Sequence, residues 1–584
     1  IVIVVIIFSS FGTEKLSPLS EPTALRLAPH GFLVDQYSFV DPMTQIFDGG
    51  RPEDRETVVS DLISALKHAE NDSRVSAVIL DLNYFLGGGI SKMAEVGEAL
   101  DAYKTSGKPL IAFADNFSQD RYYLASHADE VVLNPMGAVL LTGYGGYRQY
   151  YKDAIDKLGL NFHVFRVGDY KDFVEPYTRN NMSEQSRENN GRLLTELWSV
   201  YAEHIEMSRA LPSQSLNDYI NNLDSKLAEH QGNSAQLALE FGLIDTLATR
   251  SELEDKLIKQ FGQAKGSREV KALDYWDYLS FVETETQKQH DKVGLIVASG
   301  TIIDGDQPAG TIGSESLSEL FVQARERKDI KALVLRIDSG GGGVFASEVI
   351  YQQVKKTRDT GIPLFISMGS AAASGGYWIA AAGDEIWATP TSITGSIGVF
   401  GAFPTLERTF EKLGIHTDGI GTTELAGGMR LDRDISPKAS SILQQGVEFT
   451  YTKFLNIVAN AREMSVEDVH TIAQGQVWSG SQAKELGLVD HLGNLNQVIN
   501  AAAERAELTS FSVEKLQREL TPKEQFLQQL SGQGHSFVPT KLIDSVAPLA
   551  LRQALAPILQ PFIHISRMTD PMGLYSQCLA CVAP

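Results

Sequence analysis

The chain repeats itself, and this duplication limits its possible folds more than any other feature. The run VSAVILDLN at 75–83 leads to glycines at 87–89, and the run IKALVLRID at 330–338 leads to glycines at 340–343. Further matched pairs follow in the same order: KPLIAFADN (108–116) with IPLFISMGS (362–370), RYYLASHADEVVLNP (121–135) with GYWIAAAGDEIWATP (376–390), DKLGL (156–160) with EKLGI (411–415), and ALEFGLID (238–245) with AKELGLVD (483–490). Because chance does not keep such an order, we predict two copies of one structural unit.

Each copy alternates short β-branched runs, which end at Gly, Asn or Asp, with longer segments of helical period. SDLISALKHAE (60–70) and LSELFVQARERK (317–328) are two of the helical segments. This alternation predicts βαβ units, and therefore an α/β fold with a mostly parallel sheet in each copy. The 584 residues are also too many for one hydrophobic core, which agrees with two domains.

Three segments lie outside the two copies. The predicted organisation is 1–23 for the end of an N-terminal membrane anchor and its exit segment, 24–265 for the first repeat, 266–291 for a linker, 292–506 for the second repeat, and 507–584 for a C-terminal helical arm. The linker prediction is based on the polar run ETETQKQHD at 283–291. In the arm, LTPKEQFLQQL (520–530) and VAPLALRQALAPILQPFIHI (546–565) are patterned as amphipathic helices.

The sequence opens with the apolar run IVIVVIIF. A membrane-spanning helix needs roughly 20 apolar residues, so this run is too short to span by itself. It is compatible with the end of a membrane anchor, the remainder of a signal sequence, or a buried strand. The polar, turn-rich SSFGTEKLSPLSEPT that follows at 9–23 favours the anchor.

Composition excludes several other functions. A formal net charge of -22 argues against nucleic-acid binding, which requires a basic surface. The 12 histidines are scattered without metal-binding spacing, and no metal or cofactor is expected. The only two cysteines, Cys578 and Cys581, form a terminal C-x-x-C that would be bridged in an oxidising compartment.

The two copies differ most within GSAAASGGYW at 369–378. Ser374 is followed there by two glycines, whereas the first copy has Gln119, Asp120 and Arg121 in the matching places. The sequence of residues 369–378 alone is typical of a tight turn. The comparison of the two copies, however, favours a serine that small neighbours leave accessible to a substrate. The glycine loop at 339–343 follows a strand, and its amides together with that of Gly375 are candidate oxyanion donors; a simple turn is the alternative.

A nucleophilic serine needs a base, and no histidine lies between Ser374 and His416. A lysine can serve if burial lowers its pKa from about 10.4 to about 7–8. Lys171 lies among apolar residues in HVFRVGDYKDFVEPY (163–177), and the matching stretch of the second copy contains no lysine. The base is therefore predicted in one repeat and the nucleophile in the other. A solvated surface lysine is the alternative, and the neighbouring Asp169 and Asp172 would favour the charged amine.

Three motifs resemble those of the signal peptide peptidase A family in its long, duplicated bacterial form, also called protease IV. They are FRVGDYKDFVEP (165–176), ASGGYW (373–378) and TGSIGVFG (394–401). The resemblance implies a Clp-protease/crotonase-like fold for each repeat, with these residues at the site: Ser374 as nucleophile, Lys171 as general base, Ser396 as the lysine-orienting hydroxyl, and Gly375 and Gly342 as oxyanion donors. One departure is Gly340, where the family usually has proline.

The resemblance also implies the cellular setting. It predicts a homotetramer with a single-pass N-terminal anchor in the bacterial cytoplasmic membrane and a catalytic body on the periplasmic side. The expected substrates are cleaved signal peptides, hydrolysed through an acyl-enzyme. Two alternatives are a crotonase-like acyl-CoA enzyme, which needs no serine–lysine pair, and an inactive scaffold that binds peptides.

Overall fold

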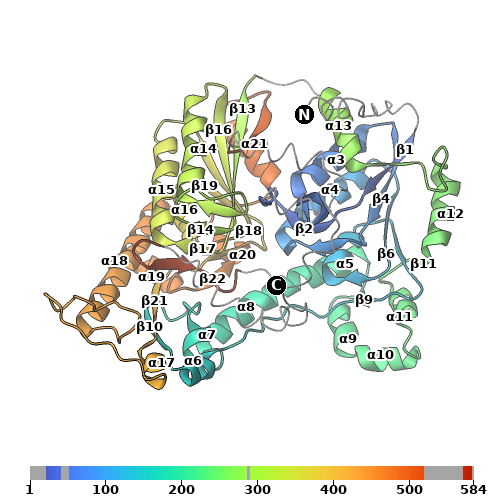
Figure 1. The fold of residues 1–584 in the computed structure, drawn as a ribbon. Helices are drawn as coiled ribbons and strands as arrows, with labels where there is room; N and C mark the ends of the chain where they lie inside the picture. Colours follow the sequence, from blue (N-terminus) through green and yellow to red (C-terminus); the bar gives the residue numbers. More distant parts are fainter. Residues whose placement is uncertain (1–21, 41–51, 286–289, 519–569, 582–584) are drawn as a thin grey trace, which may run out of the picture.

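The computed structural model describes residues 22–40, 52–285, 290–518 and 570–581 (Figure 1). Each repeat forms a sheet in which six strands follow the same order with parallel pairing, and the second sheet also contains β20 (Ile393–Gly395) and β22 (Val477–Ser479), which pair antiparallel with each other. The order is β11 (Thr246–Leu247), β8 (Glu130–Leu133), β6 (Leu110–Ala114), β4 (Val75–Asp81), β1 (Thr23–Leu27) and β12 (Ala272–Asp274) in the first repeat, and β23 (His491–Leu492), β19 (Glu385–Ala388), β18 (Leu364–Ala373), β16 (Ile330–Ser339), β13 (Lys292–Ser299) and β24 (Ser512–Leu516) in the second. The predicted duplication and α/β class are confirmed.

The sheets are buried on both faces because their central strands are apolar at nearly every position. In β16, Leu335 points into one hydrophobic core and its neighbour Val334 into another, as the two-residue period of a strand requires. The first core is completed by Ile350 of helix α15 and the second by Val498 of helix α21. Each sheet is therefore covered by helices on both sides (Figure 1).

The helices of the first repeat are α3 (Val59–Asn71), α4 (Ile90–Lys104), α5 (Gln119–Ala125), α6 (Lys152–Leu158), α7 (Glu175–Thr178), α8 (Glu184–Ser208), α9 (Ser215–Asn221), α10 (Leu223–Glu229), α11 (Ser234–Phe241), α12 (Arg250–Phe261) and α13 (Tyr275–Glu285). Those of the second are α14 (Ser314–Glu326), α15 (Val344–Arg358), α16 (Gly375–Ala380), α17 (Glu407–Lys412), α18 (Pro437–Arg462), α19 (Val466–Ile472), α20 (Gly480–Glu485) and α21 (Leu495–Arg505). Shorter elements are β2 (Gly31–Val34), β3 (Glu56–Val58), β5 (Phe85–Gly87), β7 (Phe117–Ser118), β9 (Val139–Leu140), β20 (Ile393–Gly395), β22 (Val477–Ser479) and a 3-10 turn at Pro52–Asp54.

A third sheet joins the two repeats and positions the site. Its order is β10 (Asn161–Val167), β21 (Val399–Thr405), β25 (Leu574–Gln577), β17 (Gly341–Gly343), β14 (Thr301–Ile303) and β15 (Thr311–Gly313). Strand β10 comes from the first repeat and pairs antiparallel with β21 of the second over its whole length, from Asn161–Thr405 to Val167–Val399. Figure 1 shows this crossing below the second-repeat sheet. The chain after β10 is thereby brought to the second repeat.

Several predicted segments fall at or beyond the edges of the described residues. The segment 266–291, predicted as a linker, contains β12 and α13, and β12 pairs with the first sheet. In 507–584, the described parts hold the strands β24 and β25, while the segments expected to be helical at 520–530 and 546–565 lie outside the described residues. The predicted anchor at 1–21 is also outside them. Among the helices that the structure describes, none has the length and hydropathy to cross a bilayer.

Candidate active site

Ser374 lies at a sharp turn between strand β18 and helix α16. Its backbone has φ 59° and ψ -117°, a left-handed conformation that costs a non-glycine residue free energy and recurs at functional sites. The turn is held by a hydrogen bond from the Ser374 amide to the Gly395 carbonyl, at 2.8 Å. A Cβ on Gly375 would stand 2.6 Å from the Ser347 Oγ, so the small residue after the serine is needed for close packing.

Lys171 follows strand β10 of the first repeat, and its side chain packs against residues of the second repeat. It is buried, with 1% of its surface exposed. Two glycines of the second repeat make room for it: a Cβ on Gly398 would stand 3.2 Å from the Lys171 Cδ, and a Cβ on Gly475 would stand 2.5 Å from its backbone nitrogen. The surface-lysine alternative therefore does not describe this side chain.

The lysine amine, the serine hydroxyl and a second serine meet in one buried cluster. Lys171 Nζ donates to Ser374 Oγ at 2.7 Å, to the Ser396 carbonyl at 2.9 Å and to the Ser396 Oγ at 3.0 Å. Ser374 is 0% exposed and Ser396 is 2% exposed. The structure thus brings together three residues that lie far apart in the sequence. Three acceptors on one amine also fix the direction in which that amine points.

Burial lowers the pKa of Lys171 from 10.5 to about 7, because the charged amine loses its hydration. The Asp172 carboxylate acts in the opposite direction but more weakly. Asp172 accepts hydrogen bonds from the Ser186 hydroxyl at 2.7 Å and the Asn190 amide at 3.2 Å, and Asp169 is exposed. The two neighbouring carboxylates therefore do not restore the ordinary pKa of the lysine.

The glycine loop lies directly beside Ser374. A Cβ on Gly341 would stand 2.8 Å from the Gly375 amide nitrogen and 3.0 Å from the Ser374 Cβ. A Cβ on Gly375 would in turn stand 3.2 Å from the Gly342 amide nitrogen. The loop is held despite Gly340, because Ser339 Oγ donates to the Gly300 carbonyl at 2.6 Å and accepts from the Gly341 amide at 3.1 Å. The two predicted donors, Gly342 and Gly375, lie beside the serine, and the Ser576 carbonyl faces the space next to Gly341.

The site contains one residue that the sequence did not indicate. Ser576 of β25 places its Oγ 2.6 Å from the Ser374 Oγ and donates to the Gly398 carbonyl at 3.0 Å. Cys578 and Cys581, just beyond it, are joined by a disulfide. The only signal in the sequence was the terminal C-x-x-C, which gave no indication of where it would lie.

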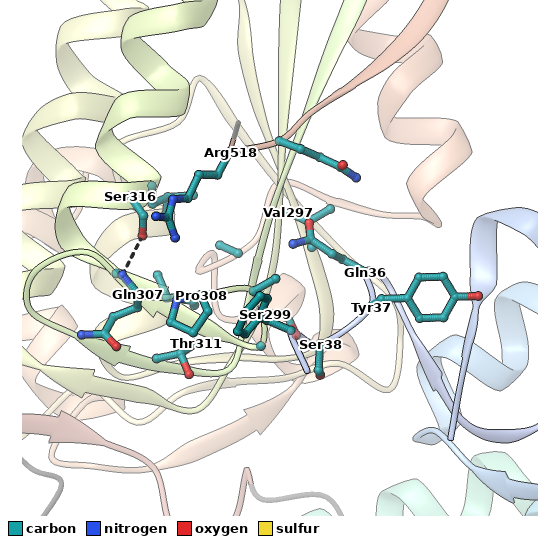
Figure 2. Close-up of a pocket in the computed structure, with 18 of the residues that line it drawn as sticks. Gln36, Tyr37, Ser38, Val297, Ser299, Gln307, Pro308, Thr311, Ser316 and Arg518 are labelled. Atoms are coloured by element: carbon teal, nitrogen blue, oxygen red, sulfur yellow. Dashed lines mark hydrogen bonds between the residues drawn. The ribbon is translucent and has the colours of Figure 1, made fainter. Parts of the chain in front are cut away.

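A cavity of about 370 Å³ lies elsewhere, and Figure 2 shows its lining. Residues 36–40 of the first repeat face the turn between β14 and β15 across it, and Arg518 borders it. Within this lining the Gln307 amide donates to Ser316 Oγ at 3.3 Å. None of the predicted site residues lines this cavity.

A serine hydroxyl hydrogen-bonded to a buried amine, on an α/β scaffold and beside a glycine loop, is the arrangement of a serine hydrolase that works by acyl transfer. The comparisons with known proteins narrow this class. The model of peptidase family S49 matches residues 102–260 and 356–509, one stretch in each repeat, so the chain belongs to this family. It is therefore a serine protease.

Known relatives cover nearly the whole chain. Protease 4 of Salmonella typhi is 34% identical over 98% of this chain and 93% of its own, and Protease 4 of Haemophilus influenzae is 34% identical over 100% and 95%. A chloroplastic serine protease SPPA of Arabidopsis thaliana is 28% identical over 80% of this chain and 69% of its own. Among solved structures, a ClpP1 mutant of Listeria monocytogenes aligns with 35% of this chain and 94% of its own, with 15% identity and a TM-score of 0.23. Family membership favours the protease over the acyl-CoA enzyme and the inactive scaffold.

Proposed function

We propose that the protein is an endopeptidase that degrades cleaved signal peptides at the bacterial cytoplasmic membrane through a dyad of Ser374 and Lys171. The observation that carries this proposal is the 2.7 Å contact between Lys171 Nζ and Ser374 Oγ in a site closed to water. A lysine with a pKa of about 7 has a substantial neutral fraction at physiological pH, as a general base requires.

The reaction proceeds in two acyl-transfer steps. Lys171 takes the proton of Ser374 as the oxygen attacks the peptide carbonyl, and the amides of Gly375 and Gly342 donate to the oxyanion. The lysine ammonium then gives this proton to the leaving amine, and the C–N bond breaks. Water attacks the acyl-enzyme while Lys171 accepts its proton, which returns to Ser374 as the acid leaves. Ser396 positions the amine through its two hydrogen bonds.

The substrate and the setting are proposed from the family. The relatives are bacterial proteases and a chloroplastic SPPA. We place the catalytic body on the periplasmic side of the membrane, held by an anchor that ends in the apolar run at 1–8, and assembled as a homotetramer. A cleaved signal peptide suits this site because its apolar segment can lie extended beside a sheet edge.

Mass spectrometry after treatment with an acylating serine inhibitor tests the dyad. We expect one adduct on Ser374 in the wild type and almost none in Lys171→Ala, because Lys171 is the base that contacts the hydroxyl among the residues that the structure describes. Lys152→Ala, at an exposed lysine of the same repeat, is the control and should react like the wild type. Equal labelling of Lys171→Ala and the wild type would exclude the lysine as the base. Turnover of an acyl-CoA ester by Ser374→Ala would favour the crotonase-like alternative.

A further inference from the structure

The C-terminal segment 570–581 lies against Ser374, in the groove between the glycine loop and β21. Its strand β25 lies between β17, the glycine loop, and β21, which follows the motif that contains Ser396. Both pairings are antiparallel, with Gly342 opposite Ser576 and Phe400 opposite Tyr575. A strand paired on both sides through its main chain is bound as an extended peptide substrate would be.

The side chains of β25 fill the groove as well. Leu574 is 2% exposed and packs in the core of the second repeat, and Tyr575 packs against Phe400 with ring centroids 5.9 Å apart. The Ser576 carbonyl oxygen lies 2.2 Å from the point where a Cβ on Gly341 would stand, the same point that lies 2.8 Å from the Gly375 amide. The carbonyl of the strand therefore faces the space needed by the carbonyl of a substrate.

Ser576 also engages the proton of the nucleophile. Its Oγ lies 3.0 Å from the Gly398 carbonyl, to which it can donate, and 2.6 Å from the Ser374 Oγ, where either hydroxyl can be the donor. When Ser576 donates to Gly398, it accepts the Ser374 proton in competition with the neutral amine of Lys171, which lies 2.7 Å from the same oxygen. With β25 in place, Ser576 therefore competes with Lys171 for the proton that must move to the lysine.

The segment is fastened at both ends. At its start, the Asp570 carboxylate accepts from the Phe345 amide at 2.8 Å, at the first turn of α15. At its end, the Cys578 amide donates to the Gly340 carbonyl at 2.7 Å, and Arg148 of the first repeat donates to the Leu579 carbonyl at 2.7 Å. A Cβ on Gly340 would stand 3.2 Å from the Cys581 Cβ, so the glycine in place of the family proline leaves room for the disulfide-closed turn.

We infer that residues 570–581 are a resident inhibitor strand, which must leave the groove before a peptide can reach Ser374. This inference rests on the proposed function, because it assumes that Ser374 is the nucleophile. The disulfide between Cys578 and Cys581 secures the strand by closing the turn that fits against Gly340. Substrate and strand compete for the same main-chain partners, so occupancy of Ser374 and docking of the strand exclude each other.

A first experiment uses the wild-type protein. The chain is acylated on Ser374 with a serine-directed inhibitor, and amide hydrogen exchange of residues 574–577 is followed by mass spectrometry. We expect these amides to be protected before labelling and to exchange at least about tenfold faster afterwards, since opening releases them to solvent. Ser374 labelled while these amides keep their protection would overturn the inference.

The disulfide gives a second readout of the same event. Cys578 and Cys581 are 2% and 8% exposed, so a dithiol reductant reaches them only when the strand is out of the groove. Reduction breaks the S–S bond and forms two thiols, while the dithiol is oxidised to its own disulfide. The thiols are then alkylated and counted by mass. We expect faster reduction after acylation of Ser374, and an unchanged rate would contradict the inference.

Variants of the segment provide the third test. Leu574→Asp places a charge in the core contact and should raise the rate of Ser374 labelling about tenfold by releasing the strand. Ser576→Ala should raise it less, since it removes only the hydroxyl contacts of the strand to Ser374 and Gly398. Met572→Ala is the matched control, because this side chain is 52% exposed in the same segment.

The outcomes separate the two proposals. If Ser374 is not labelled in the wild type or in any variant, the proposed dyad fails. If Ser374 is labelled through Lys171 but wild type, Leu574→Asp and Met572→Ala react at one rate, the dyad stands and the inhibitor strand is excluded. If Leu574→Asp does not fold, the two wild-type experiments still decide. Loss of residues 577–584 from the wild-type mass would make the segment a substrate and not an inhibitor.

Discussion

The same corner of the fold is built twice, and only the second copy turns its serine toward a lysine. In the first repeat, Ser118 precedes α5 with an ordinary extended backbone, φ -69° and ψ 168°, and its Oγ caps the helix by accepting from the Arg121 amide at 3.4 Å. In the second repeat, Ser374 precedes α16 with φ 59° and makes no such cap. Its hydroxyl points instead to Lys171 and Ser576.

The glycine loops differ in the same way. In the first repeat, a Cβ on Gly87 would stand 2.0 Å from the Asp120 Oδ2, so a carboxylate fills the space beside the loop. In the second repeat, the corresponding space beside Gly341 is bordered by the Gly375 amide and faces the carbonyl of the C-terminal strand. A parallel sheet and its turns survive when this space is filled. Acyl transfer requires that this space can be emptied and that hydrogen-bond donors line it, because the carbonyl oxygen of the substrate must enter it.

Neither repeat contains the whole site. The first repeat supplies Lys171 on the chain that follows β10, and the second supplies the hydroxyl and the glycine loop. In the proposed dyad, the second copy carries the nucleophile and the first supplies its base.

The largest effect should come from the serine that distinguishes the corners. Ser374→Ala removes the nucleophile and should lower peptide hydrolysis about 10⁴-fold or more. Ser118→Ala, at the matching corner, removes a helix cap worth about 1 kcal/mol and should leave kcat/KM unchanged. Steady-state kinetics with one apolar peptide checks both variants. A comparable loss of activity in Ser118→Ala would mean that the first corner also takes part in the reaction.

The glycine loops offer the next comparison. Gly341→Ala puts a methyl group into the space beside Ser374 at φ +100°, and should lower kcat about 10²–10³-fold, as loss of an oxyanion donor does. Gly87→Ala meets only the Asp120 carboxylate, at φ +136°. It should cost stability of about 1–3 kcal/mol and spare the rate per folded molecule. Denaturant titration and kinetics on the same samples separate the two results; equal kcat losses would contradict the assignment.

Much of this arrangement was predictable from the sequence. The repeated runs predicted two α/β units, and family membership and the common strand order confirm them. The same comparison of repeats selected Ser374 and Lys171, because differences between copies at matched positions reveal what one copy carries alone. The structure places their polar atoms 2.7 Å apart.

The third sheet was not predictable, for a physical reason. Strand β17 consists of three glycines and β25 of the residues LYSQ, and neither has the alternation that indicates a strand. Each forms because its neighbour supplies hydrogen-bond partners from a distant part of the chain. The contact between Ser576 and Ser374 depends on that pairing, so no local pattern could indicate it.

The pH dependence of activity should be set by Lys171, which contacts Ser374 in the second corner. The neutral amine of Lys171 is the active form, so kcat/KM should rise tenfold per pH unit below about 7 and become constant above it. Asp172→Asn removes the carboxylate that favours the charged amine and should move the midpoint lower. Asp120→Asn, in the first corner, should not move it. A wild-type midpoint near 10.5 would mean that the lysine is solvated in the working enzyme.

The smallest effect concerns the free energy of unfolding. It should come from the corner of the first repeat, where Asp120 fills the space beside Gly87. Burial raises the pKa of Asp120 from 3.8 to about 6, so its charged form destabilises the folded state above pH 6. Asp120→Asn should therefore stabilise the protein at pH 7, by up to about 3 kcal/mol at about 1.4 kcal/mol per pKa unit, and the gain should vanish as the pH falls toward 4.

Asp115→Asn is the matched control of opposite sign. The pKa of Asp115 is lowered by the hydrogen bond from Arg250, so its contribution is present at pH 7 and lost on acidification. Urea unfolding at pH 4.5 and 7.5 measures both; a gain for Asp120→Asn that does not depend on pH would show that the carboxylate is not desolvated, and that this corner is closed by shape alone.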